Sequence, residues 1–234
     1  MLLSIIIPVY NEKENLMKRL SFLCEQANNY PLEIIIANSP ETNDETPKVC
    51  MQYDKVTFLN CNKKGRASQM NLAANKAKGK ILLFLHADVC LPQDFYSQII
   101  FSIKEGFQFG FFAYQFDKKS TFLDFNSKFT TKDGLFAGGG DQCHFFTKET
   151  FIKLDGYNEN FCIMEDFEMM DRIRKQEISF KIIRSKATVS ARKYENNSWL
   201  KVNLINGFVF LKYKLGFSPP SLRKTYKSLL REKV

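Results

Sequence analysis

The stretch KILLFLHAD occupies residues 80–88 and joins the most apolar run of the chain to an imidazole and a carboxylate. A short unbroken apolar run of this kind is typical of a strand that is buried on both faces. Similar runs occur at LLSIIIPV (2–9), EIIIA (33–37) and VTFLN (56–60), and helix-forming segments separate them. This alternation predicts an α/β fold with a mostly parallel, twisted sheet, right-handed crossovers and helices on both faces.

The second half of the chain continues with less regular segments. FQFGFFAYQF (107–116) and ISFKIIR (178–184) are predicted strands, and DFEMMDRIRK (166–175) is a predicted helix. Two helices are expected after residue 191, and the first carries an apolar stripe. The stripe consists of Leu200, Leu204, Phe208, Leu211 and Leu215. We therefore expect one α/β domain over residues 1–191 and a basic helical tail over 192–234.

The charge of the chain is concentrated in this tail. The 234 residues have a formal net charge of +9, and the segment 192–234 contains ten Lys/Arg and two Glu, a net of +8. Such a tail suits nucleic acid, an anionic membrane surface or plain solvent. No apolar run approaches the ~18 residues of a membrane span, and the first residues read as a strand, not a signal peptide. The six cysteines include no Cys-x-x-Cys pair, which predicts free thiols in a cytoplasmic protein.

Polar residues follow the predicted strands, and ligands of such sheets bind beyond the carboxyl ends of the strands. His86-Ala87-Asp88 follows the 80–85 run. An imidazole and a carboxylate two residues apart can share a divalent cation, and an oxygen-rich site with phosphate suits Mg²⁺ or Mn²⁺. The alternative is an Asp that caps the next turn, beside a packing His.

Three other segments also have two interpretations. Glu165-Asp166 is either a favourable helix start or a general base that faces a cleft. The glycines at 138–140 either admit a ligand close to the backbone or form a simple turn. Lys63 to Arg66 either meets phosphates at a helix N-terminus or lies in a solvated loop. No P-loop, dinucleotide fingerprint or nucleophile elbow is present, and two histidines are too few for multi-His zinc catalysis.

Taken in order, these segments resemble a known family. IIIPVYNEKENL (5–16) is similar to the start of the inverting glycosyltransferases of family 2, which have the GT-A fold, a Rossmann-like α/β architecture. The stretches at 65–92 and 138–175 resemble, more narrowly, a bacterial subgroup of small family-2 enzymes described as associated with radical-SAM and selenium-domain proteins. The resemblance extends over nearly the whole chain, including SARKYENN (190–197) and the helical tail.

The resemblance implies metal-assisted transfer of a sugar from a nucleotide-diphosphate donor to an acceptor hydroxyl. It implies Asp166, with its neighbour Glu165, as the catalytic base site, and Asp88 and His86 as ligands of Mn²⁺ or Mg²⁺. The nucleotide-binding residues it implies are Pro8, Tyr10, Glu12, Asn38, Gly65, Arg66, Asn71 and Ala87. The residues it implies at the donor sugar or acceptor are Gly140, Asp141, Gln142 and Arg192.

One departure from the family pattern concerns the nucleotide base. Family members carry a base-reading Asp at the end of the second strand, where this chain has Ala37. The departure leaves the donor base open and favours, as an alternative, a non-catalytic binding or regulatory protein. A sugar-phosphate nucleotidyltransferase is a weaker alternative, because no glycine-rich loop follows the first strand.

The basic tail suggests where such an enzyme would bind. It suits peripheral contact with an anionic membrane and a lipid-linked acceptor. In the competing interpretation the two helices cover the sheet and form a homodimer. No nucleic-acid-binding module is recognised.

Overall fold

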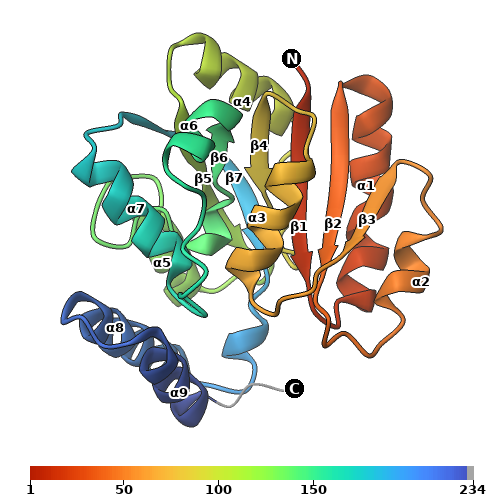
Figure 1. The fold of residues 1–234 in the computed structure, drawn as a ribbon. Helices are drawn as coiled ribbons and strands as arrows, with labels where there is room; N and C mark the ends of the chain where they lie inside the picture. Colours follow the sequence, from red (N-terminus) through yellow and green to blue (C-terminus); the bar gives the residue numbers. More distant parts are fainter. Residues whose placement is uncertain (231–234) are drawn as a thin grey trace.

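The computed structural model describes residues 1–230. Its centre is a seven-stranded sheet in the order β3-β2-β1-β4-β6-β5-β7 (Figure 1). The strands are β1 (Leu3–Val9), β2 (Leu32–Asn38), β3 (Val56–Asn60), β4 (Ile81–Phe84), β5 (Phe109–Phe116), β6 (Phe145–Thr147) and β7 (Phe180–Val189). The predicted apolar runs all form strands; β1, β2 and β4 are central and buried on both faces, whereas β3 is an edge strand with half-buried and exposed side chains.

The sheet is mostly parallel, as the sequence predicts. β1 pairs in parallel with β2 and β4, β2 with β3, and β5 with β7, whereas β6 runs antiparallel to both β4 and β5. The carboxyl ends of β1, β2, β3 and β4 therefore meet at one edge, where ligands of such sheets bind.

Helices cover both faces of the sheet. They are α1 (Lys13–Asn29), α2 (Thr46–Cys50), α3 (Arg66–Lys76), α4 (Phe95–Lys104), α5 (Thr121–Phe129), α6 (Lys148–Lys153), α7 (Glu165–Lys175), α8 (Trp199–Lys214) and α9 (Pro219–Leu229), with 3-10 turns at Gly140–Gln142 and Arg192–Tyr194. Successive side chains of β1 alternate between two cores: Ile5 packs with α1 and α4, and Ile6 packs with α3 and α7.

The start of α1 follows a sharp turn after β1. Glu12 is the N-cap residue, and no side chain caps the helix. Asn11 has a left-handed backbone (φ 53°), and its amide bonds to the loop residue Asn43 instead. Asparagine tolerates this conformation, which turns the chain sharply at the end of β1.

The tail forms a helical hairpin apart from the sheet. In Figure 1, α8 and α9 lie side by side below α5 and α7. Val202, Ile205 and Val209 of α8 pack on Leu222 of α9 and against residues just before α7. The helices therefore do not cover the sheet, and the competing interpretation fails on that point. The division at residue 191/192 stays a prediction, and residues 231–234 of the tail lie outside the described residues.

Candidate functional site

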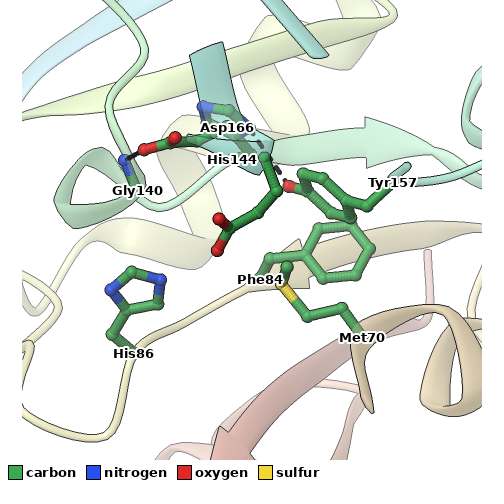
Figure 2. A pocket seen from close by; sticks show the side chains of 8 residues that line it. Met70, Phe84, His86, Gly140, His144, Tyr157 and Asp166 are labelled. Carbon is green, nitrogen blue, oxygen red and sulfur yellow. Dashed lines mark hydrogen bonds between the residues drawn. The ribbon is translucent and has the colours of Figure 1, made fainter. Parts of the chain in front are cut away.

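The site lies where the chain leaves β4 and where α7 begins. Asp166, on α7, faces Gly140 in the 3-10 turn, and His86 approaches the same glycine from below in the view of Figure 2. A Cβ at Gly140 would lie 2.7 Å from His86 Cε1 and 3.0 Å from Asp166 Oδ2. The glycine therefore lets the predicted base and a predicted metal ligand approach each other across a single backbone unit. Met70, Phe84 and Tyr157 add walls to the same pocket.

Asp166 has the environment of a general base. Its Oδ2 accepts a hydrogen bond from the Gly140 backbone N–H, and its Oδ1 accepts one from Phe167 N–H (2.9 Å). Burial, followed by the adjacent Glu165 charge, raises the pKa of Asp166 to about 6. A carboxylate with such a pKa is ionised at neutral pH and is more basic than a solvated one.

Glu165 differs sharply from its neighbour. Its side chain is only 4% exposed, and its Oε1 lies 3.3 Å from Arg66 Nη1. The same Arg66 nitrogen lies 3.3 Å from His86 Nε2. Arg66 begins α3 directly after Gly65, whose φ of 115° is open to glycine and strained for other residues. The Arg66 guanidinium thus lies between Glu165, the neighbour of the predicted catalytic base, and His86 at the exit of β4. Glu165 holds it there.

Glu12 is a further acid that interacts with the predicted metal ligands Asp88 and His86. Burial, and after it the Asp88 charge, raises the pKa of Glu12, while Arg192 and His86 lower it. These effects show that the residues after β1 and β4 share one electrostatic environment with Arg192. Among the described residues, no three His, Cys, Asp or Glu side chains are grouped closely enough to hold a metal by themselves.

Asp141 is the centre of a second set of charges. Its carboxylate lies 3.6 Å from His86 Nδ1 and 3.7 Å from Lys193 Nζ. Burial opposes its ionisation, but Lys193, His86 and Arg66 outweigh burial and hold the pKa of Asp141 well below its usual range. Sequence reasoning missed Lys193 and chose the adjacent Arg192. The SARKYENN segment was the available signal, but only the fold shows which of its two cations faces Asp141.

Two buried side chains shape the glycine loop. Gln142 is 1% exposed; its Oε1 accepts from the backbone N–H groups of Gly138 and Gly139, and its Nε2 donates to the Phe112 and Thr130 carbonyls. Its amide therefore joins the glycine loop to the carbonyls of Phe112 and Thr130, and its part at the sugar or acceptor stays a prediction. His144 was not singled out as a site residue either. Burial lowers its pKa to about 4, so it is neutral; it donates to Gly138 O (2.6 Å) and accepts from Tyr157 (3.1 Å).

The other predicted nucleotide contacts lie at the same edge of the sheet, with one exception. Pro8 in β1, Tyr10, Asn38 at the end of β2, Gly65 and Ala87 belong to strand exits or to the start of α3. The exception is Asn71, whose amide donates to Tyr157 O (2.8 Å) and accepts from Tyr157 N–H (2.9 Å). Asn71 thus fastens the segment before α7 to α3, and its part in nucleotide binding stays a prediction.

Asn38 occupies the place next to the missing base-reading Asp. It is buried, and its Nδ2 donates to Asn60 Oδ1 on β3 (3.1 Å). Its own Oδ1 is buried without a hydrogen-bond partner among the described residues. Ala37 contributes only its carbonyl, which accepts from Gln69 Nε2 (2.7 Å). At the end of the site where the nucleotide base is expected, this chain thus has the amides of Asn38 and Asn60, whereas family members carry a carboxylate there.

Gly140→Ala tests the close approach directly. Because the new methyl group would overlap His86 and Asp166, we expect one of them to move by about 1 Å and kcat to fall about 100-fold. Gly134→Ala is the matched control, since a Cβ there meets nothing within 4 Å. Steady-state kinetics on both variants give the comparison, and equal rates would mean that the two side chains need not meet at Gly140.

Comparison with known proteins places this arrangement in a family. The sequence pattern described as "Glycosyl transferase family 2" matches residues 4–163. A dolichol-phosphate mannosyltransferase of Pyrococcus furiosus is 28% identical over 109 residues, which are 45% of this chain and 31% of that protein. An uncharacterized glycosyltransferase of Rickettsia prowazekii is 36% identical over 101 residues, 42% of this chain and 31% of its own length. The matched regions thus span about a third of these relatives.

Solved structures show the same fold at low identity. The mannosyltransferase PcManGT of Pyrobaculum calidifontis, in complex with GDP-Man and Mn²⁺, superposes with a TM-score of 0.68 at 17% identity, over 97% of this chain and 68% of that one. TarS of S. aureus with UDP-GlcNAc gives 0.65 at 12% identity, over 98% and 71%. These likenesses identify the sheet and its helices as a GT-A fold. With the match over residues 4–163, they lead to the conclusion that this chain belongs to glycosyl transferase family 2.

Proposed function

We propose that this chain transfers a sugar from a nucleotide diphosphate to an acceptor hydroxyl in one displacement that inverts the anomeric carbon. The acceptor oxygen forms the new glycosidic bond as the bond to the donor phosphate oxygen breaks. Asp166 takes the acceptor proton, and the nucleoside diphosphate leaves with the electron pair. We further propose that the chain belongs to the subgroup associated with radical-SAM and selenium-domain proteins, which its residues 65–92, 138–175 and 190–197 resemble.

The observation that carries the proposal is the meeting of Asp166 and His86 across Gly140. A base on one side and a strand-exit imidazole on the other leave room for a reacting centre between an acceptor and a diphosphate. Arg66 supplies positive charge between the two sides, next to the expected position of the leaving group. Lys193, which balances Asp141, adds a second cation at the same place.

The residues at the β4 exit fit a divalent cation. Mg²⁺ in phosphate-binding sites is held by one or two protein carboxylates, with substrate oxygens and water filling the other positions. Asp88, with the imidazole of His86, is such an incomplete set, and the Glu12 carboxylate lies in the same environment. Mn²⁺ accepts both oxygen and imidazole ligands. A bound cation would neutralise charge on the leaving diphosphate.

Solved structures with the same fold support a nucleotide-sugar donor in this site. Besides the two structures above, glucosyl-3-phosphoglycerate synthase of Mycobacterium tuberculosis was solved with Mn²⁺, UDP and phosphoglyceric acid, and it superposes with a TM-score of 0.60. Its identity to this chain is 11%, over 92% of this chain and 78% of that one. GDP-Man contains guanine, whereas UDP-GlcNAc and UDP contain uracil, so the base is a question for experiment.

A thermal-shift panel of nucleoside diphosphates and their sugars, with and without Mn²⁺, tests the donor site. A ligand that binds only the folded state raises Tm by mass action. We expect one base to give a shift that grows when Mn²⁺ is added. Because the end of the site where the base is expected offers the Asn38 amide instead of a carboxylate, we expect that base to be selected by amide contacts. Absence of any shift across the panel would favour the non-catalytic binding protein.

A further inference from the structure

An unpartnered apolar surface lies on α5, α8 and the segment that precedes the glycine loop. On α8 the predicted stripe faces outward, whereas the buried positions are Val202, Ile205, Val209 and Phe210. The surface, here called the apolar face, consists of Phe122, Phe125, Phe129, Leu135, Phe136, Leu200, Leu204, Phe208, Leu211, Leu215 and Phe217, each between 48% and 69% exposed. Within residues 1–230, the structure has no other comparable grouping of exposed aromatic and aliphatic side chains.

Contacts between the elements make this one continuous surface. The Phe122 ring lies 5.1 Å from that of Trp199 at the start of α8, and the Phe136 ring lies 4.9 Å from that of Phe210. Asn126 of α5 donates a hydrogen bond to Asn203 of α8 (3.0 Å). Figure 1 shows α8 running below α5, on the side of the molecule that faces away from the sheet. α8 is therefore apolar on both sides, one packed and one bare.

Basic residues border the α8 part of the face, where Lys214 is paired with Asp171 of α7 (2.7 Å) and Lys201 has no acidic partner among the described residues. Residues 199–230 contain six Lys/Arg and no Asp or Glu. At about 100° per residue, Lys201 and Lys212 lie on one flank of the α8 stripe and Lys214 on the other. Lys212 Nζ also lies over the rings of Phe208 (5.9 Å) and Phe217 (4.8 Å). Exposed Phe and Leu flanked by lysine form the pattern of a segment that lies in a membrane interface.

We propose that the apolar face docks this protein on the surface of an anionic bilayer. The rings and leucines enter the boundary between headgroups and acyl chains, and the flanking lysines meet lipid phosphates. A second copy of this chain is the less suitable occupant, because a symmetric contact would bring two acid-free α8–α9 hairpins together. Within the described residues, no helix is both long and apolar enough to cross a bilayer, so the contact proposed here is one at the surface.

The proposal concerns a surface outside the site, but the two are connected. Phe210 of α8 contacts Phe167 (5.2 Å), which directly follows Asp166. If the proposed function holds, docking places the Asp166 side of the site beside the bilayer. The acceptor is then a membrane-held molecule with a free hydroxyl. Binding to vesicles needs no substrate, so its result is independent of the reaction.

Vesicle flotation tests the docking. We expect the wild type to float with phosphatidylcholine vesicles that contain phosphatidylglycerol, less at high salt. Leu204→Ser with Phe208→Ser should weaken binding about tenfold or more, since both side chains lose their burial in lipid. The matched control is Ile152→Ser with Phe101→Ser, whose side chains are similarly exposed (62% and 57%) on other helices. All four positions are exposed, so neither pair removes a core contact.

A second readout identifies the surface that touches lipid. Trp199 is the single tryptophan of the chain and begins α8. We expect its fluorescence to be quenched by brominated acyl chains in anionic vesicles. Flotation with no difference between the two double variants, or an unquenched Trp199, would overturn the proposal. So would a dimer in sedimentation equilibrium that the Leu204→Ser/Phe208→Ser pair dissociates while vesicles do not bind the wild type.

Discussion

Asp166→Asn is expected to lower kcat about 1,000-fold and to leave the affinity for the nucleotide-sugar donor unchanged. The amide keeps the shape of the side chain and one oxygen for the Gly140 N–H, but it cannot take the acceptor proton. In the proposed reaction the donor binds at the strand exits and not at this carboxylate, so its binding should be spared. Single-turnover kinetics, together with donor titration by calorimetry, separate the two effects.

The same carboxyl should control the acid side of the pH–rate profile. Burial and the Glu165 charge raise the pKa of Asp166 to about 6, so the base becomes protonated as the pH falls through this value. We expect the wild-type kcat/KM to fall tenfold per pH unit below about pH 6, as Asp166 becomes protonated. Because the raised pKa means that the ionised form is disfavoured in the fold, Asp166→Asn should unfold at the same or a higher temperature at pH 7.

Asp124→Asn is the matched control, since it makes the same change in the first turn of α5, at an exposed position. Its rate and pH profile should equal those of the wild type. If Asp166→Asn keeps more than about a tenth of the wild-type rate, proton removal by Asp166 is not the source of catalysis. Glu165 would not replace it, because that carboxylate is 4% exposed and holds Arg66.

The mostly parallel sheet could be predicted because its central strands carry their own signal. The runs at 2–9, 33–37 and 80–85 are apolar on both faces, and only a central parallel strand buries such a run. β6 was missed because three residues after a glycine loop show no period. Its antiparallel pairing with β4 and β5 depends on tertiary contact and not on local sequence.

The sequence indicated the candidate acidic residues of the site better than the side chains that hold them and the glycine loop in place. Asp88 and Asp166 stand directly after a strand and at a helix start, and a sequence reveals such places. Lys193 and Gln142 depend on which way a turn points: Lys193 faces Asp141, and Gln142 turns inward to hold the glycine loop. The apolar stripe of α8 was also read correctly as a stripe, but periodicity cannot tell whether a helix face meets protein or stays bare.

Asp88→Ala is expected to reduce strongly the part of the donor's thermal shift that depends on Mn²⁺ and to weaken donor binding in Mn²⁺ about 100-fold. The carboxylate is the expected oxygen ligand at the β4 exit, and the His86 imidazole alone is a poor site for a hard cation. The measurement is Tm against donor concentration, with Mn²⁺ and with EDTA. Asp54→Ala, an exposed acid in the loop before β3, is the control and should behave as the wild type.

Glu12 makes this prediction sharper. Burial and then Asp88 raise the pKa of Glu12, so removal of Asp88 makes Glu12 easier to ionise and leaves it as the nearest carboxylate. If both acids serve the cation, Glu12→Gln should weaken the Mn²⁺-dependent shift further in the Asp88→Ala background than in the wild type. If Glu12 serves only as the N-cap residue of α1 and does not contact the cation, the effects of the two changes should be additive. A full Mn²⁺-dependent shift in the double variant would remove the β4 exit as the metal site and leave Asp141 as the carboxylate to test.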